Sequence, residues 1–273
     1  MSNQTKVSNL PTRRSAAALL GSLGVGSALP LAAQQAGRTQ VAPSFSGVWL
    51  KGGGAGATTP GERGPRTPVS QWSAEELPFT PKGEAKLKAN KSGKGPRAVL
   101  PALGNDPLGN ANPPGLYRTL IYPRAFEIIQ TNAKIIQIFE WSRVWRIIWT
   151  DGRPAPEDVD AGPFWYGHSV GKWEADTLVV QTLAVDSRSW LDEWGTPFSD
   201  SARFEERWRR TAPNRLEMTL KVTDPEFYSK PWTSIPVAFN LDPQLELTEQ
   251  IFAPIDEVEF NKRIRDPAAG LKR

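Results

Sequence analysis

The feature of this chain that most constrains its fold is a series of short apolar runs between residues 122 and 253. The runs are rich in β-branched and aromatic residues, and turn-forming Gly, Pro, Asn, Asp and Ser separate them. Runs of this kind at this spacing are typical of strands joined by short turns. They predict nine strands, at 124–131, 134–141, 144–150, 166–172, 177–185, 203–210, 215–223, 232–241 and 246–253.

This pattern predicts an all-β, mainly antiparallel domain, built either as a sandwich or as a lipocalin-like barrel. One stretch favours a helix instead, because Trp141, Trp145 and Trp149 recur every four residues. Strands are still favoured there, because apolar residues would surround such a helix on every side and because Trp145, Ile147 and Trp149 also alternate. The Asp-Gly dipeptide at 151–152 is in addition typical of a hairpin turn.

The residues ahead of the strand series predict an irregular N-terminal segment, residues 37–120, followed by an antiparallel β domain at 121–273. One strand, at 45–50, is expected to join that domain. The Gly/Pro/Thr-rich stretch at 51–70 cannot bury enough apolar surface to order itself, and it predicts a flexible loop. A short helix is expected over 81–89.

The first 36 residues predict an export signal. Lys6, Arg13 and Arg14 precede an apolar run of small residues at 16–33, and the segment contains no acid. The arginine pair favours the twin-arginine route over the general secretory route. A stable membrane anchor is not expected, because glycines and serines interrupt the run and an anchoring helix needs about 20 mostly apolar residues. The predicted location is therefore periplasmic or secreted.

Charge and residue content exclude several classes of protein. The net charge of +4 includes the three cations of the leader, so the mature chain is nearly neutral, which disfavours a nucleic-acid partner. With no cysteine and one histidine, disulfides, thiol catalysis and Cys- or His-rich metal sites are excluded, and no cofactor is expected. No nucleophile elbow, phosphate loop or dinucleotide fingerprint occurs. Nothing in the sequence indicates a particular oligomeric state.

The densest group of chemically active residues lies at 150–176 and contains His168, the only histidine. An imidazole exchanges protons near pH 7 without a shifted pKa, so His168 is the first candidate for acid/base chemistry. In a strand at 166–172, the glycines at 167 and 171 lie on the face opposite His168 and leave room for a ligand or another backbone. The structural alternative is a core histidine that donates to a carbonyl group.

Other candidate site residues lie close to His168 in sequence. One carboxylate from Asp151, Glu174 or Asp176 would orient the imidazole, and Tyr166 would serve as a general acid or oxyanion donor. Aromatic and basic side chains are expected to bind the substrate, namely Trp165, Trp173, Trp149, Arg153 and Tyr117. Each group has a structural alternative, because hairpins need Asp-Gly, turn acids are usually solvated, and most of the eleven tryptophans must belong to the core.

The same region resembles a known family. Residues 151–154 (DGRP) and 165–180 (WYGHSVGKWEADTLVV) resemble a large family of uncharacterised secreted bacterial proteins with the motif DGRxHP…W-x-GHS-[IV]-G-x-W-E-G-D-T-L-V-V. Shorter matches, such as 106–109 and 259–265, extend the resemblance over most of the mature chain. Many relatives have histidines where this chain has Ala155, Phe198 and Arg203, so a metal site built from those histidines is not expected here.

Two hypotheses of different classes follow. The first is an exported, cofactor-independent enzyme of the lyase, isomerase or hydratase type, in which His168 moves a proton on an apolar or aromatic small molecule held among tryptophans. The second is a lipocalin-like periplasmic binding protein in which His168 and a tyrosine hold the polar end of the ligand. An imidazole next to a carboxylate in an enclosed pocket favours the enzyme.

Replacement of both Arg13 and Arg14 by lysine is expected to retain the precursor in the cytoplasm, because the twin-arginine route reads the arginine pair rather than positive charge alone. Cell fractionation followed by immunoblotting measures this retention. Unchanged export of the double variant would instead indicate the general secretory route.

Overall fold

The computed structural model describes residues 43–52, 69–110, 112–155, 157, 162–248, 258–268 and 270. These residues fall in the unit that begins at Val41. The export signal predicted at 1–36 and most of the loop predicted at 51–70 lie outside the described residues.

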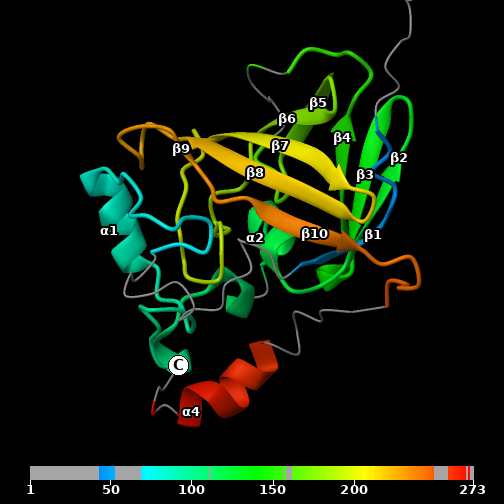
Figure 1. Cartoon of the computed structure of the whole chain (residues 1–273). Helices are drawn as coiled ribbons and strands as arrows, with labels where there is room; N and C mark the ends of the chain where they lie inside the picture. Colours follow the sequence, from blue (N-terminus) through cyan, green and yellow to red (C-terminus); the bar gives the residue numbers. More distant parts are fainter. Residues whose placement is uncertain are drawn as a thin grey trace, which may run out of the picture. The chain divides into compact units, whose positions relative to one another are not determined.

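The β-rich runs form a closed barrel (Figure 1). In the described part of the chain, one sheet has the order β10-β1-β2-β3-β4-β5-β6-β7-β8-β9, and pairing of β10 with β8 closes nine of these strands into the barrel. The strands are β1 (Gly47–Lys51), β2 (Phe126–Gln130), β3 (Lys134–Phe139), β4 (Val144–Trp149), β5 (His168–Glu174), β6 (Thr177–Leu183), β7 (Arg203–Ala212), β8 (Arg215–Thr223), β9 (Trp232–Thr233) and β10 (Val237–Leu241). The expected all-β fold is confirmed, as a barrel.

Short helices accompany the barrel. The predicted helix is α1 (Pro81–Ala89), which begins after Thr80, whose Oγ1 accepts a hydrogen bond of 3.1 Å from the Gly83 N–H. The other described helical segments include α2 (Leu116–Ile121), α4 (Asp266–Ala268), the 3₁₀ turns η2 (Pro101–Leu103), η3 (Pro107–Asn110) and η4 (Trp141–Arg143), and the π-helical turn η5 (Asn261–Arg265). The expected irregular segment at 37–120 therefore contains a second helix, α2.

The connection between β4 and β5 differs from the expected hairpin. The two strands pair in parallel, with Ile148 opposite Ser169 and Trp149 opposite Val170, so the Asp-Gly dipeptide at 151–152 does not join antiparallel neighbours. A parallel pair needs a crossover of about a dozen residues or more, and the chain between Trp149 and His168 is long enough to supply one. The remaining pairs around the barrel are antiparallel.

Two predicted strands need further correction. The run at 232–241 is divided into β9 and β10, and Pro236 lies in the gap, where its lack of an N–H group prevents a continuous ladder. The run at 246–253 is not a strand at residues 246–248, and its remaining residues lie outside the described part. The spacing of Trp145 and Trp149 nevertheless reflects a strand, because both residues lie in β4.

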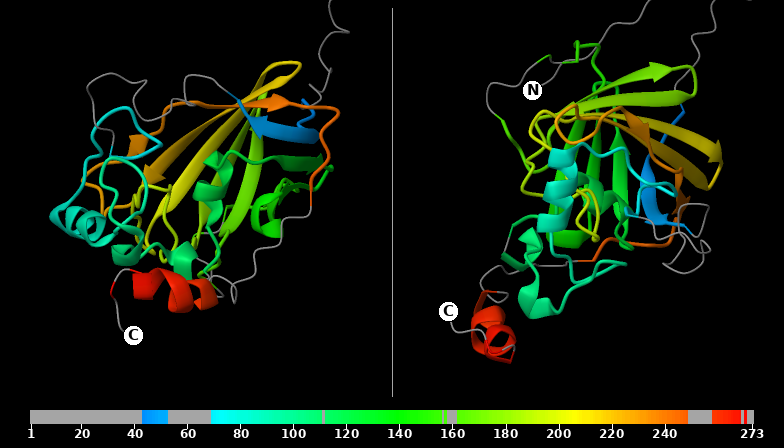
Figure 2. Two further views of the ribbon diagram at one scale, coloured as in Figure 1. Left: turned by 90° about the horizontal axis from the view of Figure 1, so that it is seen from below. Right: turned by 90° about the vertical axis from the view of Figure 1, so that its left-hand side faces the viewer.

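The inside of the barrel is filled by side chains. Alternate residues of the strands point inward and carry large aromatic groups that are fully buried, namely Trp49, Phe126, Phe139, Phe204, Trp208 and Phe239. All six residues of α2 are buried as well, and the ring of Tyr117 lies 4.4 Å from that of Phe204. Figure 2 shows α2 against the inner side of the strands. This barrel therefore encloses packed side chains where a lipocalin encloses its ligand cavity.

A polar cluster lies within this aromatic interior. Arg146 and Glu206 form an ion pair of 2.8 Å, and their side chains are 1% and 0% exposed. Arg146 uses all five of its N–H donors, two of them on Glu206 at 2.8 and 2.9 Å. We call the ion pair and its hydrogen-bonding partners the barrel-core cluster, which contains Arg146, Glu206, Gln137, Ser169, Thr182, Tyr117 and Trp208.

Tyr117 connects α2 to this cluster. Its hydroxyl donates to Oε1 of Glu206 at 3.1 Å, and the indole N–H of Trp208 donates to Oε2 at 2.8 Å. Burial, and secondarily the charge of Glu206, raises the pKa of Tyr117 well above its ordinary value of 10. The phenol therefore stays protonated and remains a donor throughout the neutral range.

Glu206→Gln is expected to lower the free energy of unfolding by about 3–5 kcal/mol, because it leaves the charge of Arg146 unpaired inside the barrel. Urea unfolding followed by tryptophan fluorescence measures this loss. Glu205→Gln is the matched control, because Glu205 points outward and hydrogen bonds to Gln181, and it should cost less than about 1 kcal/mol. Equal losses in the two variants would contradict a central role for the ion pair.

Candidate functional site

His168 lies at the start of β5 on the outer side of the barrel. The next residue, Ser169, points inward and accepts a hydrogen bond of 2.9 Å from Nε of Arg146. Side chains alternate along a strand, so the half-buried imidazole of His168 points away from the barrel core. Within the described part of the chain, no residue forms a hydrogen bond or ion pair with this imidazole.

The carboxylates expected to orient His168 are engaged elsewhere. Glu174 occupies the other end of β5, about 20 Å away at the usual rise of a strand, and its carboxylate lies 2.8 Å from Arg207. Asp176 lies 2.8 Å from Nε of Arg209, whose hydrogen bond lowers the pKa of the Asp176 carboxyl. Neither carboxylate is brought to the imidazole.

Tyr166 is separated from His168 in a different way. It precedes β5, and its ring packs against the core 6.4 Å from the ring of Phe139. Its hydroxyl is buried without a hydrogen-bond partner in the described part of the chain. Burial raises the pKa of this phenol well above its ordinary value of 10. Tyr166 and His168 thus lie in different environments, one in the core and one outside the barrel.

Several predicted residues meet at a groove on the outer side of the barrel. The groove, of about 490 Å³, lies between residues 150–155 and β5, and Arg153, Trp173 and Glu174 line it. We call it the β5 groove. Arg153 stacks on Trp149 at 3.9 Å and lies 2.6 Å from Asp151, and hydrogen bonds from Arg153 lower the pKa of the Asp151 carboxyl.

The other two residues predicted to bind substrate lie apart from this groove. Trp165 stacks with Arg188, whose guanidinium lies 4.5 Å from the indole. Tyr117 belongs to the barrel-core cluster. The predicted substrate-binding set is therefore distributed over three places, and His168 does not line the β5 groove.

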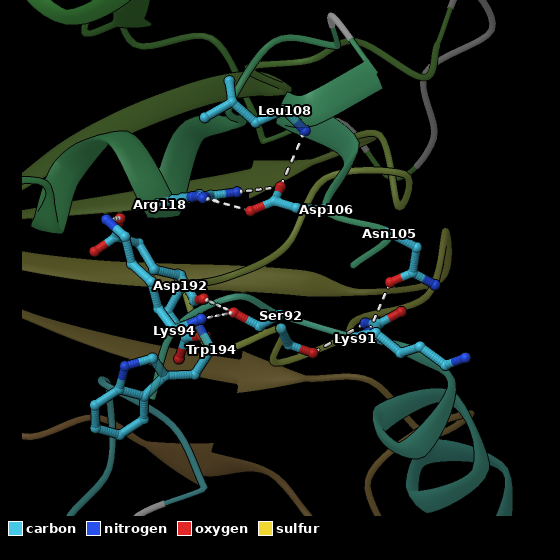
Figure 3. Close-up of polar contacts among 12 residues, drawn as sticks. Lys91, Ser92, Lys94, Asn105, Asp106, Leu108, Arg118, Asp192 and Trp194 are labelled. Carbon is cyan, nitrogen blue, oxygen red and sulfur yellow. Dashed lines mark hydrogen bonds and ion pairs between the residues drawn. The ribbon is translucent and has the colours of Figure 1, made fainter. Parts of the chain in front are cut away.

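A second pocket, which the sequence did not reveal, lies beside α2. Its volume is about 380 Å³. We call it the α2 pocket, and Figure 3 shows several of its side chains. It is lined by Gly93, Lys94, Gly104, Asp106, Leu108, Gly109, Arg118, Tyr122, Trp141, Glu193 and Arg265.

Arg118 is the anchor of the α2 pocket. Although only 4% of its side chain is exposed, it lines the pocket and forms a two-pronged ion pair with Asp106 at 2.7 and 2.8 Å (Figure 3). The indoles of Trp141 and Trp190 lie 5.9 and 6.0 Å from its guanidinium carbon. Its Nε is buried without a hydrogen-bond partner in the described residues. The guanidinium is therefore held rigidly by a carboxylate and two aromatic rings.

The remaining lining of the pocket is aromatic and cationic. Tyr122 and Trp141 stack at 3.7 Å with an angle of 16° between their rings, and Nζ of Lys94 lies 5.9 Å from the Tyr122 ring. Lys94 also pairs with Glu193 at 2.5 Å. With Arg265 included, the lining carries three cations, and each has a carboxylate partner: Lys94 pairs with Glu193, Arg118 with Asp106, and Arg265 with Asp266 outside the lining.

Side-chain hydrogen bonds to the backbone hold the irregular segments around this pocket. Asp192 is fully buried and accepts hydrogen bonds from the backbone N–H groups of Gln71 at 2.8 Å and Thr196 at 3.1 Å. Asn105 accepts from the Lys91 N–H at 2.6 Å, and Ser92 donates to the backbone carbonyl of Glu193 (Figure 3). Such bonds replace the ladder hydrogen bonds that a segment with little regular structure lacks.

The C-terminal helical segment also contacts the pocket. The amide of Asn261 donates to the carbonyl of Gly109 at 2.7 Å, and Nε of Arg265 lies 3.1 Å from Asp266. The pocket thus joins residues from the irregular N-terminal segment, α2, the turn after β3 and the end of the chain. No local motif indicates such a site, because its lining residues come from separate segments of the sequence between Gly93 and Arg265.

Two further observations concern the described residues alone. They contain no group of three His, Cys, Asp or Glu side chains placed to hold a metal ion. None of their helices has both the length and the apolar character that a membrane span requires.

Comparison with protein-family models, curated proteins and solved structures finds no match to this chain. The family resemblance noted from the sequence motif therefore stays a prediction.

His168→Ala is expected to change the free energy of unfolding by no more than about 1 kcal/mol, because the imidazole faces outward without a described polar partner. Thermal and urea unfolding of both proteins measure this change. A loss of more than about 3 kcal/mol, typical of a broken core contact, would show that His168 is a structural histidine.

Proposed function

We propose that this protein is an exported small-molecule binding protein and that its ligand is a flat organic anion held in the α2 pocket. The observation that carries the proposal is the position of Arg118, a buried cation fixed beside an aromatic pair in the lining of a pocket. Export rests on the predicted leader, and the binding function on the geometry of the pocket.

The aromatic and the cationic side chains of the lining would contact different parts of the ligand. The stacked rings of Tyr122 and Trp141 offer an apolar surface for the flat body of the ligand. Lys94, Arg118 and Arg265 attract its anionic group, which is a carboxylate in the simplest case. A volume of about 380 Å³ lies within the range of small-molecule sites, roughly 300–1,000 Å³.

Because Arg118 is already held in place, a ligand can bind without rearranging its side chain. Its guanidinium is already oriented by Asp106 and by the flanking indoles, so little side-chain entropy is lost when a ligand arrives. The unpartnered Nε gives a further reason for a polar ligand, because a buried donor without an acceptor costs about 1–3 kcal/mol. A ligand atom that reaches it after a small shift of the side chain would recover part of that cost.

The alternative hypothesis, a His-based lyase, isomerase or hydratase, has less support. His168 lines neither the α2 pocket nor the β5 groove, and the carboxylates predicted to orient it pair with arginines. Acid/base chemistry needs the base within hydrogen-bond reach of the substrate, directly or through one water. Binding without turnover is the function that the described contacts favour.

Titration with 2-naphthoate and with its neutral amide tests the proposal, with tryptophan fluorescence and calorimetry as readouts. The carboxylate should bind at least about tenfold more tightly than the amide, a difference of about 1.4 kcal/mol for one charge-assisted contact. Lys94→Glu should weaken carboxylate binding by a similar factor, because it reverses one charge of the lining.

Lys221→Glu is the matched control, because Lys221 lies exposed on β8 away from the pocket. It makes the same change in net charge, so affinity should stay close to that of the unmodified protein. Equal affinity for the carboxylate and the amide, or equal effects of the two charge reversals, would contradict the proposed site.

A further inference from the structure

We propose that the protein forms a two-fold symmetric dimer through the outer side of β2, β3 and β4, so that the partner of this surface is a second copy of the same chain. We call the surface the isoleucine face. Its outward side chains are Glu127, Ile129, Lys134, Ile136, Ile138, Trp145, Ile147 and Trp149. The proposal does not depend on the function proposed for the α2 pocket.

The first observation is that the outer side of three neighbouring strands is apolar. β2, β3 and β4 lie side by side (Figure 1), and Ile129, Ile136 and Ile147 form one row across them. In the next outward row, Ile138 of β3 pairs with Trp145 of β4. The side chain of Trp145 is 62% exposed and that of Ile129 is 38% exposed. Large apolar groups of the face are therefore in contact with water.

Such an outer side is unusual for a barrel whose inside is already packed. An antiparallel sheet with one side in the core commonly has polar residues on the other side. β7 follows this rule, because its outward residues are Arg203, Glu205, Arg207 and Arg209. Contiguous exposed apolar side chains, by contrast, mark surfaces that bind a partner. The isoleucine face therefore has the composition of an interface rather than of a solvated surface.

The second observation is that the face carries one charge of each sign, at opposite ends. Lys134 begins β3, whereas Glu127 lies opposite Ile138, four residues further along β3 and roughly 14 Å away along the strand. Lys134 lies 5.7 Å from the ring of Trp149. Neither Lys134 nor Glu127 has an ion-pair partner in the part of the chain that the structure describes. Each charge is therefore available to a partner.

This charge pattern is complementary to itself. A two-fold axis that lies between two such faces and runs across the strands brings the Lys134 end of each copy against the Glu127 end of the other. Two equivalent ion pairs then flank an apolar centre formed by the isoleucine row, which is the usual arrangement of a protein interface. A lipid surface would instead leave the Glu127 carboxylate in apolar surroundings without a counter-ion, which is costly.

Charge reversal at the two ends of the face tests the dimer and its symmetry, with sedimentation equilibrium of the mature protein as the readout. Glu127→Lys and Lys134→Glu should each weaken self-association by about tenfold or more, because each places like charges opposite one another. The variant with both changes should regain the dimer, because the ion pair forms again with its signs exchanged. Lys221→Glu, on β8, is the matched control and should have no effect.

A mixture of the two single variants gives a sharper test of the same geometry. Each variant alone should be mainly monomeric, but one carries two lysines and the other two glutamates at the paired positions. Mixed in equal amounts, they should form a heterodimer with about the affinity of the unmodified protein. Failure of both the mixture and the combined variant to restore association would overturn the proposed pairing.

Trp145→Asp tests the apolar part of the interface. It should abolish the dimer while circular dichroism and thermal unfolding stay unchanged, because the indole lies outside the barrel and is largely exposed. Binding of 2-naphthoate should also be unchanged, because Trp145 does not line the α2 pocket. The dimer and the ligand site can thus fail separately.

Three outcomes would overturn the proposal. The first is a mass equal to that of one chain at concentrations up to roughly 1 mM, where an association worth only about 4 kcal/mol would be visible. The second is a dimer that persists in Trp145→Asp and in both charge reversals, since its interface would lie elsewhere. The third is a monomer that binds phosphatidylglycerol vesicles through Trp145, which would assign the face to a lipid surface.

Discussion

The ion pair between Arg146 and Glu206 is the interaction on which the rest of the barrel depends. It joins β4 to β7 across the interior, and its hydrogen bonds recruit side chains from β3, β5 and β6. Through Tyr117 it also fixes α2. A buried ion pair gives little net stability compared with apolar packing, but a misplaced one is costly. In this barrel every donor of Arg146 has an acceptor, and the acceptors come from β3, β5, β6 and β7, so a shift of any of these strands would leave a buried donor unpaired.

The same arrangement places the α2 pocket. Tyr117 is held by Glu206, and Arg118, the next residue, points toward Asp106 at the pocket. One short helix therefore carries the contact to the barrel core and the anchor of the proposed ligand site. A change in the core that moved α2 by even a small amount would displace Arg118 from the aromatic pair formed by Tyr122 and Trp141.

The barrel strands could be predicted from local pattern, because β-branched and aromatic runs at 126–149 and 203–223 show period-two burial. The short helix α2 could not, because all six of its residues are buried and it has no polar face to create a helical period. The α2 pocket escaped prediction for a related reason. Lys94, Arg118 and Arg265 are ordinary surface residues in sequence, and only the fold makes them neighbours.

His168 is the only histidine of the chain, but its chemistry alone does not say where it lies in the barrel. Strand alternation puts Ser169 and Gly171 on the face opposite His168, but nothing local says which face points into a barrel, because glycine and serine on one side and an imidazole on the other leave the apolar contrast weak. The strand direction was equally hidden. Whether β5 runs parallel or antiparallel to β4 depends on the path of the long connection between them rather than on the residues of either strand.

The way in which the barrel closes also has a consequence for biosynthesis. β1 lies near the start of the described chain, and its two neighbours are β2 and β10, the second of which ends at Leu241. The ring is therefore incomplete until synthesis of the chain has reached the end of β10 at Leu241. Until then the strands made first have a free edge and unburied aromatic residues. A protein built in this way depends on late, long-range contact for its order, and its folding should be slow compared with that of a helical protein of the same length.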